Sequence, residues 1–324
     1  MRAIVCETLG PPSSLVLREL PEPSDPGQGE IKVAIAARGV QFVDVLMVAG
    51  QYQTKPSLPF IPGGEGAGTV IAVGAGITDF KEGDQVMTRH PPGAYAEMCT
   101  IAVNAAIPVP KGLSLEQAAG FRSAYSTAYH ALVQRGRLQK DEVLLVHGAA
   151  GGIGLAAVQV GQVLGATVIA TAGSDEKLKV VASYGAEHTI NYSNGFRDQV
   201  KELTDGRGAD VIYDPVGADV FDESMRCLNW GARLLILGFV GGRPALAKSN
   251  HLLIKGASAV GVRVGGFYEH EPELAAENLR VLAQWATDGK IVPHVSHTFP
   301  LECAAEAMQA IIDRQVIGKC VLTN

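Results

Sequence analysis

The sequence has few cysteines, and no two of them lie close together. The five are Cys6, Cys99, Cys227, Cys303 and Cys320. Disulfide frameworks and zinc–cysteine sites need cysteines at short, regular spacings, so neither is predicted. The histidines are dispersed as well, and the nearest pair, His294 and His297, lies in a strand-like segment where this spacing directs the rings to opposite faces. We expect no metal site.

The sequence also has no basic run and few aromatic residues. It carries 27 Lys and Arg against 33 Asp and Glu, a net charge of −6, and aromatics make up 6% of the chain. A polyanion needs a basic surface, and a single strand of nucleic acid also needs stacking platforms. We therefore expect no nucleic-acid partner and no membrane partner. The N-terminus MRAIVCETLG lacks the leader of a secreted protein, which favours the cytoplasm.

Charge is absent altogether from Val143 to Ser174. This stretch could be a membrane span, but it contains seven glycines and His147, and its hydrophobic period changes along its length. Val143–Val146 has strand length, Ile153–Leu164 has a helical pattern of small residues, and Thr167–Thr171 is a second apolar run. Strand, turn, helix and strand in this order is typical of a dinucleotide-binding unit.

The turn after the first strand carries the glycines that a pyrophosphate needs. Ala149, Gly151 and Gly154 hold the GxGxxG spacing, with alanine in the first place. Gly152 adds a further point of close approach, and Ile153 opens the helix. A pyrophosphate at a helix N-terminus is bound by backbone N–H groups, which larger side chains would cover. The pattern predicts a dinucleotide cofactor.

The end of the second strand distinguishes the two nicotinamide cofactors. An acidic residue there would bind the ribose 2′-hydroxyl of NADH and repel a 2′-phosphate. That place is Ala172, and Gly173, Ser174 and Lys177 follow it. A small residue, a hydroxyl and a cation suit a phosphate dianion, and Tyr192 could close over it. We expect NADPH; the alternative reading of Lys177 is a lysine that only solvates a helix start.

Composition divides the chain into three regions. Residues 1–122 are rich in glycine and proline, with short alternating runs, which predicts a mostly antiparallel, barrel-like β domain with room for one helix at Val43–Ala49. Residues 123–260 alternate helical runs with apolar strands, which predicts a parallel sheet covered on both faces. Residues 261–324 end in the strand-like GKCVLTN and are expected to return to the first domain, with the active site in the cleft between the two domains.

Hydrophobic period also predicts the elements of the second half. We expect helices at Ser123–Gln134, Lys177–Tyr184, Gly195–Leu203, Asp222–Leu228, Glu273–Asp288 and Glu302–Asp313, and strands at Val211–Asp214, Arg233–Gly238 and in the alternating segment 258–267.

Ligands of a parallel sheet bind at the carboxyl ends of its strands. The turns expected at those ends are His147–Ile153, Ala172–Ser174, Asp214–Gly217 and Gly238–Gly241. The third turn includes Val216, and the fourth includes Phe239 and Val240. Asp214 precedes Pro215, and we interpret it as a hydrogen-bond acceptor in a turn rather than a catalytic group.

With these residues in view, the whole chain resembles the medium-chain dehydrogenase/reductase superfamily, and within it the zinc-independent NADPH:quinone oxidoreductases that include zeta-crystallin. The resemblance rests on motifs spread over the chain, which are GVQFVDVLMVAGQY, PFIPGGEGAGTVIAVGAGITDFKEGDQV, STAYHAL, HGAAGGIGLAAVQVGQVLGA, YDPVGA and GKCVL. It implies an α/β chain with a GroES-like, mostly antiparallel β-barrel domain and a Rossmann domain with a doubly wound parallel sheet. It also implies a homodimer that forms through an edge strand of the Rossmann domain.

The resemblance bears on the metal as well. Zinc alcohol dehydrogenases of the superfamily hold zinc with a Cys three residues before the Asp that corresponds to Asp44, and with a His before the Glu that corresponds to Glu65. Here those places hold Gln41 and Gly64. The resemblance thus implies hydride transfer without a metal, from NADPH to a quinone or another conjugated α,β-unsaturated carbonyl.

Site residues are implied by the same resemblance. At the reacting end it implies Gln41, where relatives commonly have Asn, together with Tyr52 and Thr127. Around the 2′-phosphate it implies Gly173, Lys177, Tyr192 and Arg314, and beside the carboxamide and ribose it implies Gly238–Val240. The proton could come from Tyr52 or from water.

Two arginines leave an alternative open. Arg122 and Arg263 stand in segments expected near the active site and could bind a carboxylate or a thioester-linked phosphate, although arginines commonly form ion pairs at domain interfaces. If they bind substrate, an acrylate or enoyl-CoA reductase becomes the better reading. A non-catalytic alternative is NADPH sensing or RNA binding, which the negative net charge and scarce aromatics disfavour.

Overall fold

The computed structural model describes residues 1–90 and 92–324, which form two compact units. Unit 1 comprises Met1–Ser123 and Ala286–Asn324, and unit 2 comprises Ala124–Trp285. We expected the chain to return to the first unit from residue 261, whereas the return begins at Ala286.

Side-chain contacts within unit 2 account for the later return. The ring of His130 stacks on Phe267, with centroids 4.0 Å apart, and the side-chain amides of Gln134 and Asn278 bond to each other at 3.1 and 3.2 Å. These contacts attach the segment after residue 261 to the helix that opens unit 2.

Unit 2 contains a six-stranded parallel sheet in the order β10-β9-β8-β11-β12-β13. The strands are β8 (Val143–Val146), β9 (Thr167–Ala172), β10 (His188–Asn191), β11 (Ala209–Asp214), β12 (Leu228–Ile236) and β13 (Ser258–Gly261). Their order makes β8 and β11 neighbours at the point where the winding reverses, which is where doubly wound sheets bind ligands. The four residues of β8 are all buried, as expected for a strand covered on both faces.

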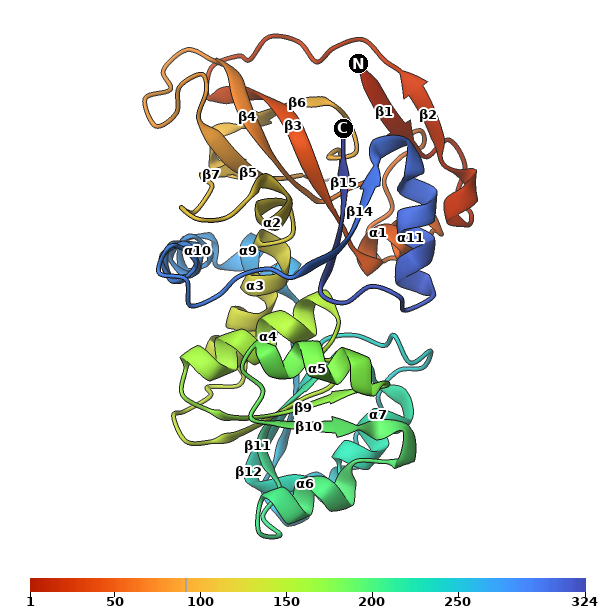
Figure 1. Cartoon of the computed structure of the whole chain (residues 1–324), viewed down its shortest axis with the longest axis vertical. Coiled ribbons are helices and arrows are strands. Elements are labelled where there is room, and N and C mark those ends of the chain that lie inside the picture. Colours follow the sequence, from red (N-terminus) through yellow and green to blue (C-terminus); the bar gives the residue numbers. More distant parts are fainter. Residues whose placement is uncertain (91) are drawn as a thin grey trace. The chain divides into compact units, whose positions relative to one another are not determined.

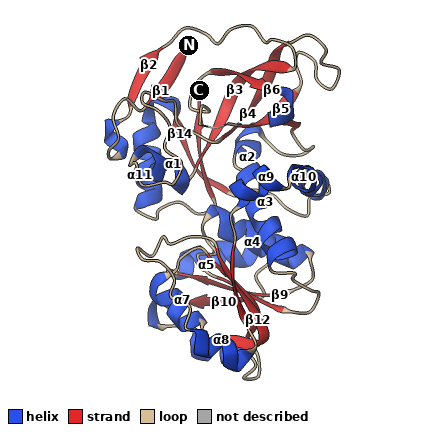
Figure 2. Cartoon of the chain, turned by 180° about the vertical axis from the view of Figure 1, so that it is seen from behind, coloured by secondary structure: helices blue, strands red, loops and turns tan. Residues whose placement is uncertain are grey.

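Helices cover both faces of this sheet (Figures 1 and 2). The helices that lie wholly or mostly in unit 2 are α3 (Arg122–Tyr129), α4 (Gly152–Val163), α5 (Asp175–Ser183), α6 (Arg197–Leu203), α7 (Ala218–Ser224), α8 (Ser249–Lys255), α9 (Val264–His270) and α10 (Pro272–Thr287). The doubly wound parallel sheet predicted from the sequence is confirmed.

Among the differences between unit 2 and the prediction, three have a local physical cause. The helix from Ser123 changes into a π-helix at His130–Arg135, where the N–H of Gly136 bonds to the carbonyl of Ala131. The helix expected at Asp222–Leu228 is wrong in register, because Gly217, with φ +68°, starts α7 at Ala218 and Leu228 already belongs to β12.

The third difference lies in the alternating segment 258–267. The strand expected there ends at Gly261, and α9 begins at Val264 with a helical bond from the N–H of Phe267 to the carbonyl of Arg263. Alternation of Val262, Val264 and two glycines fits a strand as well as the start of this short helix, so the period did not distinguish them.

Unit 1 contains a seven-stranded sheet in the order β14-β15-β3-β4-β5-β7, with β6 paired to β3, and a two-stranded β1-β2 pair. The strands are β1 (Arg2–Val5), β2 (Val16–Glu19), β3 (Glu30–Val40), β4 (Glu65–Val73), β5 (Gln85–Arg89), β6 (Met98–Ala102), β7 (Ala106–Pro108), β14 (Val295–Pro300) and β15 (Lys319–Thr323). All pairings are antiparallel except β14 with β15, so the mostly antiparallel prediction is confirmed.

The helices of unit 1 are α1 (Phe42–Val48), α2 (Leu115–Ala119) and α11 (Ala304–Ile312). We predicted a single helix in the first 122 residues. This was wrong, because α2 also forms there. Its signal is a short capping box, in which the Ser114 hydroxyl accepts the N–H of Gln117 at 3.2 Å and the Gln117 side chain accepts the N–H of Ser114 at 3.0 Å.

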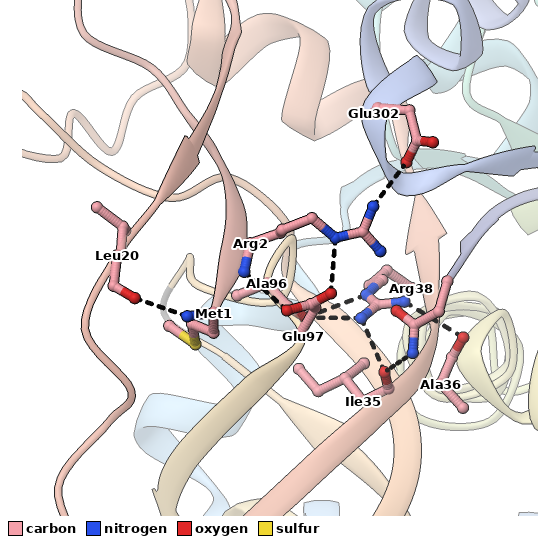
Figure 3. A network of polar contacts seen from close by, with 10 residues as sticks. Met1, Arg2, Leu20, Ile35, Ala36, Arg38, Ala96, Glu97 and Glu302 are labelled. Atoms are coloured by element: carbon pink, nitrogen blue, oxygen red, sulfur yellow. Dashed lines mark hydrogen bonds and ion pairs between the residues drawn. The ribbon is translucent and has the colours of Figure 1, made fainter.

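A buried arginine ties β3 to the chain before β6 (Figure 3). The Arg38 guanidinium donates to the carbonyl of Ala96 at 2.8 and 3.2 Å, and to those of Ile35 and Ala36 at 2.7 and 3.2 Å. Next to it, Arg2 donates to Glu97 at 2.7 Å. Backbone carbonyls thus solvate a cation that burial would otherwise penalise, and burial lowers the pKa of Arg38 to about 10.

No helix in residues 1–90 and 92–324 is long and apolar enough to cross a membrane.

Candidate functional site

The glycine turn of unit 2 joins β8 to α4. Gly148 has φ +56°, in the left-handed region, and its carbonyl accepts the N–H of Gly151 at 2.9 Å. A Cβ on Gly154 would collide with the Gly148 carbonyl and with the Cα of Ala149. Only glycine therefore lets the first turn of α4 approach its strand this closely.

The start of α4 has the features of a phosphate-binding helix end. The N-cap residue, Gly151, contributes no side-chain bond, and the first turn of the helix holds no acidic residue. The N–H groups of Gly152, Ile153 and Gly154 precede the first intrahelical donor, Leu155, which bonds to Gly151 at 2.8 Å. Unpaired N–H groups and the helix dipole favour an anion, so these residues fit a pyrophosphate.

The turn after β9 brings together the residues expected around a 2′-phosphate. Ser174 is the N-cap of α5, and its hydroxyl accepts the N–H of Lys177 at 3.4 Å. A Cβ on Gly173 would lie 3.2 Å from the Tyr192 hydroxyl, so that ring stands directly beside the turn. Ala172 is buried at the end of β9 and provides no carboxylate.

Arg314, the fourth residue expected near the phosphate, belongs to unit 1. It follows α11 with φ +57° and lies in the turn that leads toward β15.

The turns after β11 and β12 are bonded to each other. Oδ1 of Asp214 accepts the N–H groups of Val216 and Gly217 at 2.7 and 2.9 Å, which confirms Asp214 as a turn acceptor. The Val216 carbonyl accepts the N–H of Gly241 at 2.8 Å. A Cβ on Gly238 would lie 3.1 Å from the Pro215 carbonyl, so this glycine allows the two turns to approach closely.

The second of these turns is also held at its far end. Phe239 and Val240 are largely exposed, and the Arg243 guanidinium beyond them bonds to Asp219 and Asp222 on α7 at 2.7 and 2.6 Å. The loop after β12 is thereby attached to the helix that follows β11.

Thr127 lies half-buried on α3, which is joined to the cofactor-binding helix. The Gln159 side-chain amide on α4 donates to the Tyr125 hydroxyl on α3 at 2.8 Å, between two buried side chains. Thr127 is therefore carried on a helix whose position is coupled to that of α4.

His147 joins β8 to two neighbouring elements. Its Nδ1 lies 2.9 Å from the Thr171 hydroxyl on β9, and its Nε2 lies 2.8 Å from the Ser224 hydroxyl on α7. The Ser224 hydroxyl donates to the carbonyl of Val220 at 2.7 Å, so Nε2 carries the proton and Nδ1 accepts from Thr171. Burial lowers the pKa of His147 to about 3, which keeps the ring neutral.

Gln41 in unit 1 is held at its backbone and at its side chain. It is the N-cap of α1, and its N–H donates to Oδ2 of Asp44 at 2.9 Å. Its side-chain Oε1 accepts the Ser123 hydroxyl at 2.9 Å. Tyr52 follows α1, where its N–H bonds to the carbonyl of Leu46 at 3.2 Å and its side chain is half-buried.

Beside Gln41 lies a buried ion pair. Oε1 of Glu65 accepts from the Lys319 ammonium at 2.9 Å, and its Oε2 accepts the backbone N–H of Ser123 at 2.8 Å. We call Gln41, Asp44, Glu65, Tyr95, Ser123 and Lys319 the polar cluster of unit 1. The sequence reasoning used Asp44 and Glu65 only as markers of the zinc positions, and missed Ser123, Tyr95 and Lys319.

The two arginines have different surroundings. Arg122 is buried in unit 1 and donates to the carbonyl of Ala105 at 2.6 Å. Arg263 is an exposed residue of unit 2 at the N-cap of α9, 3.9 Å from the Glu269 carboxylate. Across residues 1–90 and 92–324, no group of three or more His, Cys, Asp or Glu side chains is arranged to hold a metal ion.

Comparison with known proteins places this geometry in a family. Residues 27–127 match the alcohol dehydrogenase GroES-like domain, and residues 152–280 match the zinc-binding dehydrogenase domain. The quinone oxidoreductase-like protein 2 homolog of Nematostella vectensis is 38% identical over 327 residues, which cover 100% of this chain and 89% of that protein. The chain belongs to the quinone oxidoreductase family of medium-chain dehydrogenases/reductases.

Two solved structures resemble this chain along its whole length. Escherichia coli quinone oxidoreductase complexed with NADPH superposes with a TM-score of 0.91 at 31% identity, and the match covers 100% of both chains. A 2-haloacrylate reductase superposes with a TM-score of 0.84 at 32% identity, and that match covers 100% of this chain and 99% of the other. Membership of the quinone oxidoreductase family confirms the resemblance drawn from the sequence and the pairing of a GroES-like with a Rossmann domain, and it makes the chain an oxidoreductase.

Proposed function

We propose that this protein is an NADPH-dependent oxidoreductase that reduces quinones or other conjugated α,β-unsaturated carbonyls without a metal. The observation that carries the proposal is the pair of turns after β8 and β9, which combine a phosphate-binding helix end with a second turn that lacks a carboxylate. A 2′-phosphate is compatible with that second turn, where NADH-specific sites have an acidic residue. The NADPH complex of the Escherichia coli relative supports the same cofactor.

The protein's part in the reaction is to bind, orient and stabilise charge. NADPH, when bound, supplies a hydride from C4 of its nicotinamide ring. The N–H groups at the start of α4 bind the pyrophosphate, and Gly173, Ser174, Lys177, Tyr192 and Arg314 bind the 2′-phosphate. Thr127 on α3 and the Gly238–Val240 turn orient the nicotinamide end.

Gln41 replaces the Lewis acid of the zinc enzymes in this proposal. Its carboxamide donates to the acceptor oxygen, where negative charge develops as hydride arrives, and a donor aimed at such a charge lowers the barrier. Two places that hold zinc ligands in those relatives are here Gln41 and Gly64, and Glu65 is already bonded to Lys319 and Ser123. Tyr52 or water then supplies the proton.

A second candidate is reduction of acrylates or enoyl-CoA thioesters. The similarity to a 2-haloacrylate reductase favours it, and Arg122 and Arg263 would be the residues that bind the anionic group. Against it, the Arg122 guanidinium is buried and donates to the carbonyl of Ala105.

The two candidates are separated by following the oxidation of NADPH and NADH with a benzoquinone, an o-quinone, an enone, an acrylate and an enoyl-CoA. We expect turnover with the quinones or the enone and a strong preference for NADPH. Turnover limited to the acrylate or enoyl-CoA would replace the proposed function by the second candidate. NADPH binding without oxidation by any acceptor would instead favour a sensing role.

We also propose that the protein is a homodimer that pairs through unit 2. β13 lies at the edge of the parallel sheet, and near it the side chains of Trp230, Leu253 and Ile254 are 74%, 82% and 68% exposed. An open strand edge beside large exposed apolar side chains is unfavourable in water and suits a partner. Light scattering should give a dimer mass for the wild type and a monomer mass for Leu253→Glu; a monomeric wild type would refute the proposal.

A further inference from the structure

We propose that Ser123 is a positioning residue that fixes which end of the Gln41 carboxamide faces the hydride acceptor. The proposal rests on the function proposed above, in which Gln41 donates to the acceptor oxygen. It adds to that site a residue that acts through Gln41.

The orientation of the carboxamide follows from its contacts. The Ser123 hydroxyl donates to Oε1 of Gln41 at 2.9 Å, so the oxygen end of the amide faces Ser123. The nitrogen end faces Gly64, where Nε2 lies 3.8 Å from the place that a Cβ would take. Because Gly64 has no side chain, no Cβ takes the space beside Nε2, and the proposal assigns that space to the acceptor oxygen.

An amide that rotates by half a turn exchanges a donor for an acceptor. With its oxygen toward the substrate, Gln41 would repel the negative charge that develops on the acceptor oxygen instead of stabilising it. That rotamer would break the bond from the Ser123 hydroxyl to Oε1 and turn the Nε2 donor toward a donating hydroxyl, which disfavours it.

Ser123 is itself held by the buried ion pair. Its N–H donates to Oε2 of Glu65 at 2.8 Å, and Oε1 of Glu65 is fixed by Lys319 at 2.9 Å. Glu65 and Lys319 are 2% and 7% exposed, so this support excludes water and is rigid. The backbone of Gln41 is fixed independently through Asp44, so the carboxamide is constrained from both ends of the residue.

The test compares single and double variants by steady-state kinetics with NADPH and a quinone or enone. We expect Ser123→Ala to lower kcat by about tenfold, with the KM for NADPH unchanged, because only a preorganised donor is lost. Ser123→Thr keeps the hydroxyl and should restore most of kcat. In a Gln41→Ala background, Ser123→Ala should cause no further loss, since the residue acts only through Gln41.

Thr88→Val is the matched control for loss of a buried hydroxyl in unit 1. Thr88 is buried on β5, and its hydroxyl lies 2.8 Å from Nε2 of His90. This variant should lose thermal stability and keep kcat.

Two results would overturn the positioning role: an unchanged kcat in Ser123→Ala, or an equal loss with and without Gln41. Failure of the proposed function looks different, because the wild type itself would then reduce neither quinones nor enones.

Discussion

The hydroxyl of Tyr95 donates a hydrogen bond to Oδ2 of Asp44 at 3.1 Å, and both side chains are buried in unit 1. The same carboxylate oxygen accepts the N–H of Gln41. Burial nevertheless raises the pKa of Asp44 to about 7, with Glu65 adding to the rise and the two hydrogen bonds and Lys319 opposing it. Desolvation therefore outweighs two hydrogen bonds, and Asp44 titrates near neutral pH.

Asp44→Asn should change the dependence of stability on pH. The folded pKa of Asp44, about 7, lies above its ordinary value of 3.8, so its contribution to stability is full below pH 3.8 and is lost as the pH rises through 7. Asparagine can still accept both hydrogen bonds but does not ionise. Between about pH 5.5 and pH 7, the free energy of unfolding of the wild type should fall by about 2 kcal/mol relative to that of the variant. Parallel Tm–pH curves for the two proteins would contradict this.

His147 should make unit 2 sensitive to acid. Its folded pKa, about 3, lies below the ordinary 6.5, so the stability that it contributes is full above pH 6.5 and is lost as the pH falls toward 3. The loss amounts to about 1.4 kcal/mol per pH unit. His147→Gln should be less stable at neutral pH and should show a shallower fall of Tm in acid. If Tm falls equally steeply with decreasing pH in both proteins, other groups cause the acid sensitivity.

The dinucleotide-binding unit could be predicted from the sequence because its signals are local. The strand Val143–Val146 is found at the predicted residues, and α4 starts one residue earlier than predicted, at Gly152. Glycine spacing and the period of hydrophobic residues are defined by residues close together in the sequence. A short stretch of sequence is therefore enough to predict this unit. The prediction of a strand in the second half of segment 258–267 was wrong for the same reason. A short stretch of valines and glycines fits a strand as well as the start of a helix.

The polar cluster of unit 1 could not be predicted in this way. Ser123 is 82 residues from Gln41 and 58 from Glu65, and Lys319 is 254 residues from Glu65. Each residue alone is an ordinary polar side chain, and only the fold brings them together. The family resemblance pointed to Gln41 but contained nothing about what holds its side chain.

Lys177 should determine cofactor preference. Lys177→Ala removes a cation beside the turn of Gly173 and Ser174, so the KM for NADPH should rise by about tenfold, whereas that for NADH should stay constant. Lys179→Ala is the matched control, because it removes an exposed charge two residues later on the same helix. The assignment fails if Lys177→Ala and Lys179→Ala raise the KM for NADPH by the same factor. It also fails if Lys177→Ala raises the KM for NADH as much as that for NADPH.

The buried pair of Glu65 and Lys319 should be costly to break from one side. Lys319→Met leaves the Glu65 carboxylate buried, bonded to the N–H of Ser123 but without its cation, and an uncompensated buried charge typically costs about 3–5 kcal/mol. Glu65→Gln combined with Lys319→Met removes both charges while keeping an acceptor for Ser123, so the double variant should be more stable than Lys319→Met alone. Urea denaturation of the wild type, the two single variants Glu65→Gln and Lys319→Met, and the double variant measures this directly. If the double variant loses the sum of the single losses, the two side chains are not coupled, and the support inferred for Ser123 would lack its rigid base.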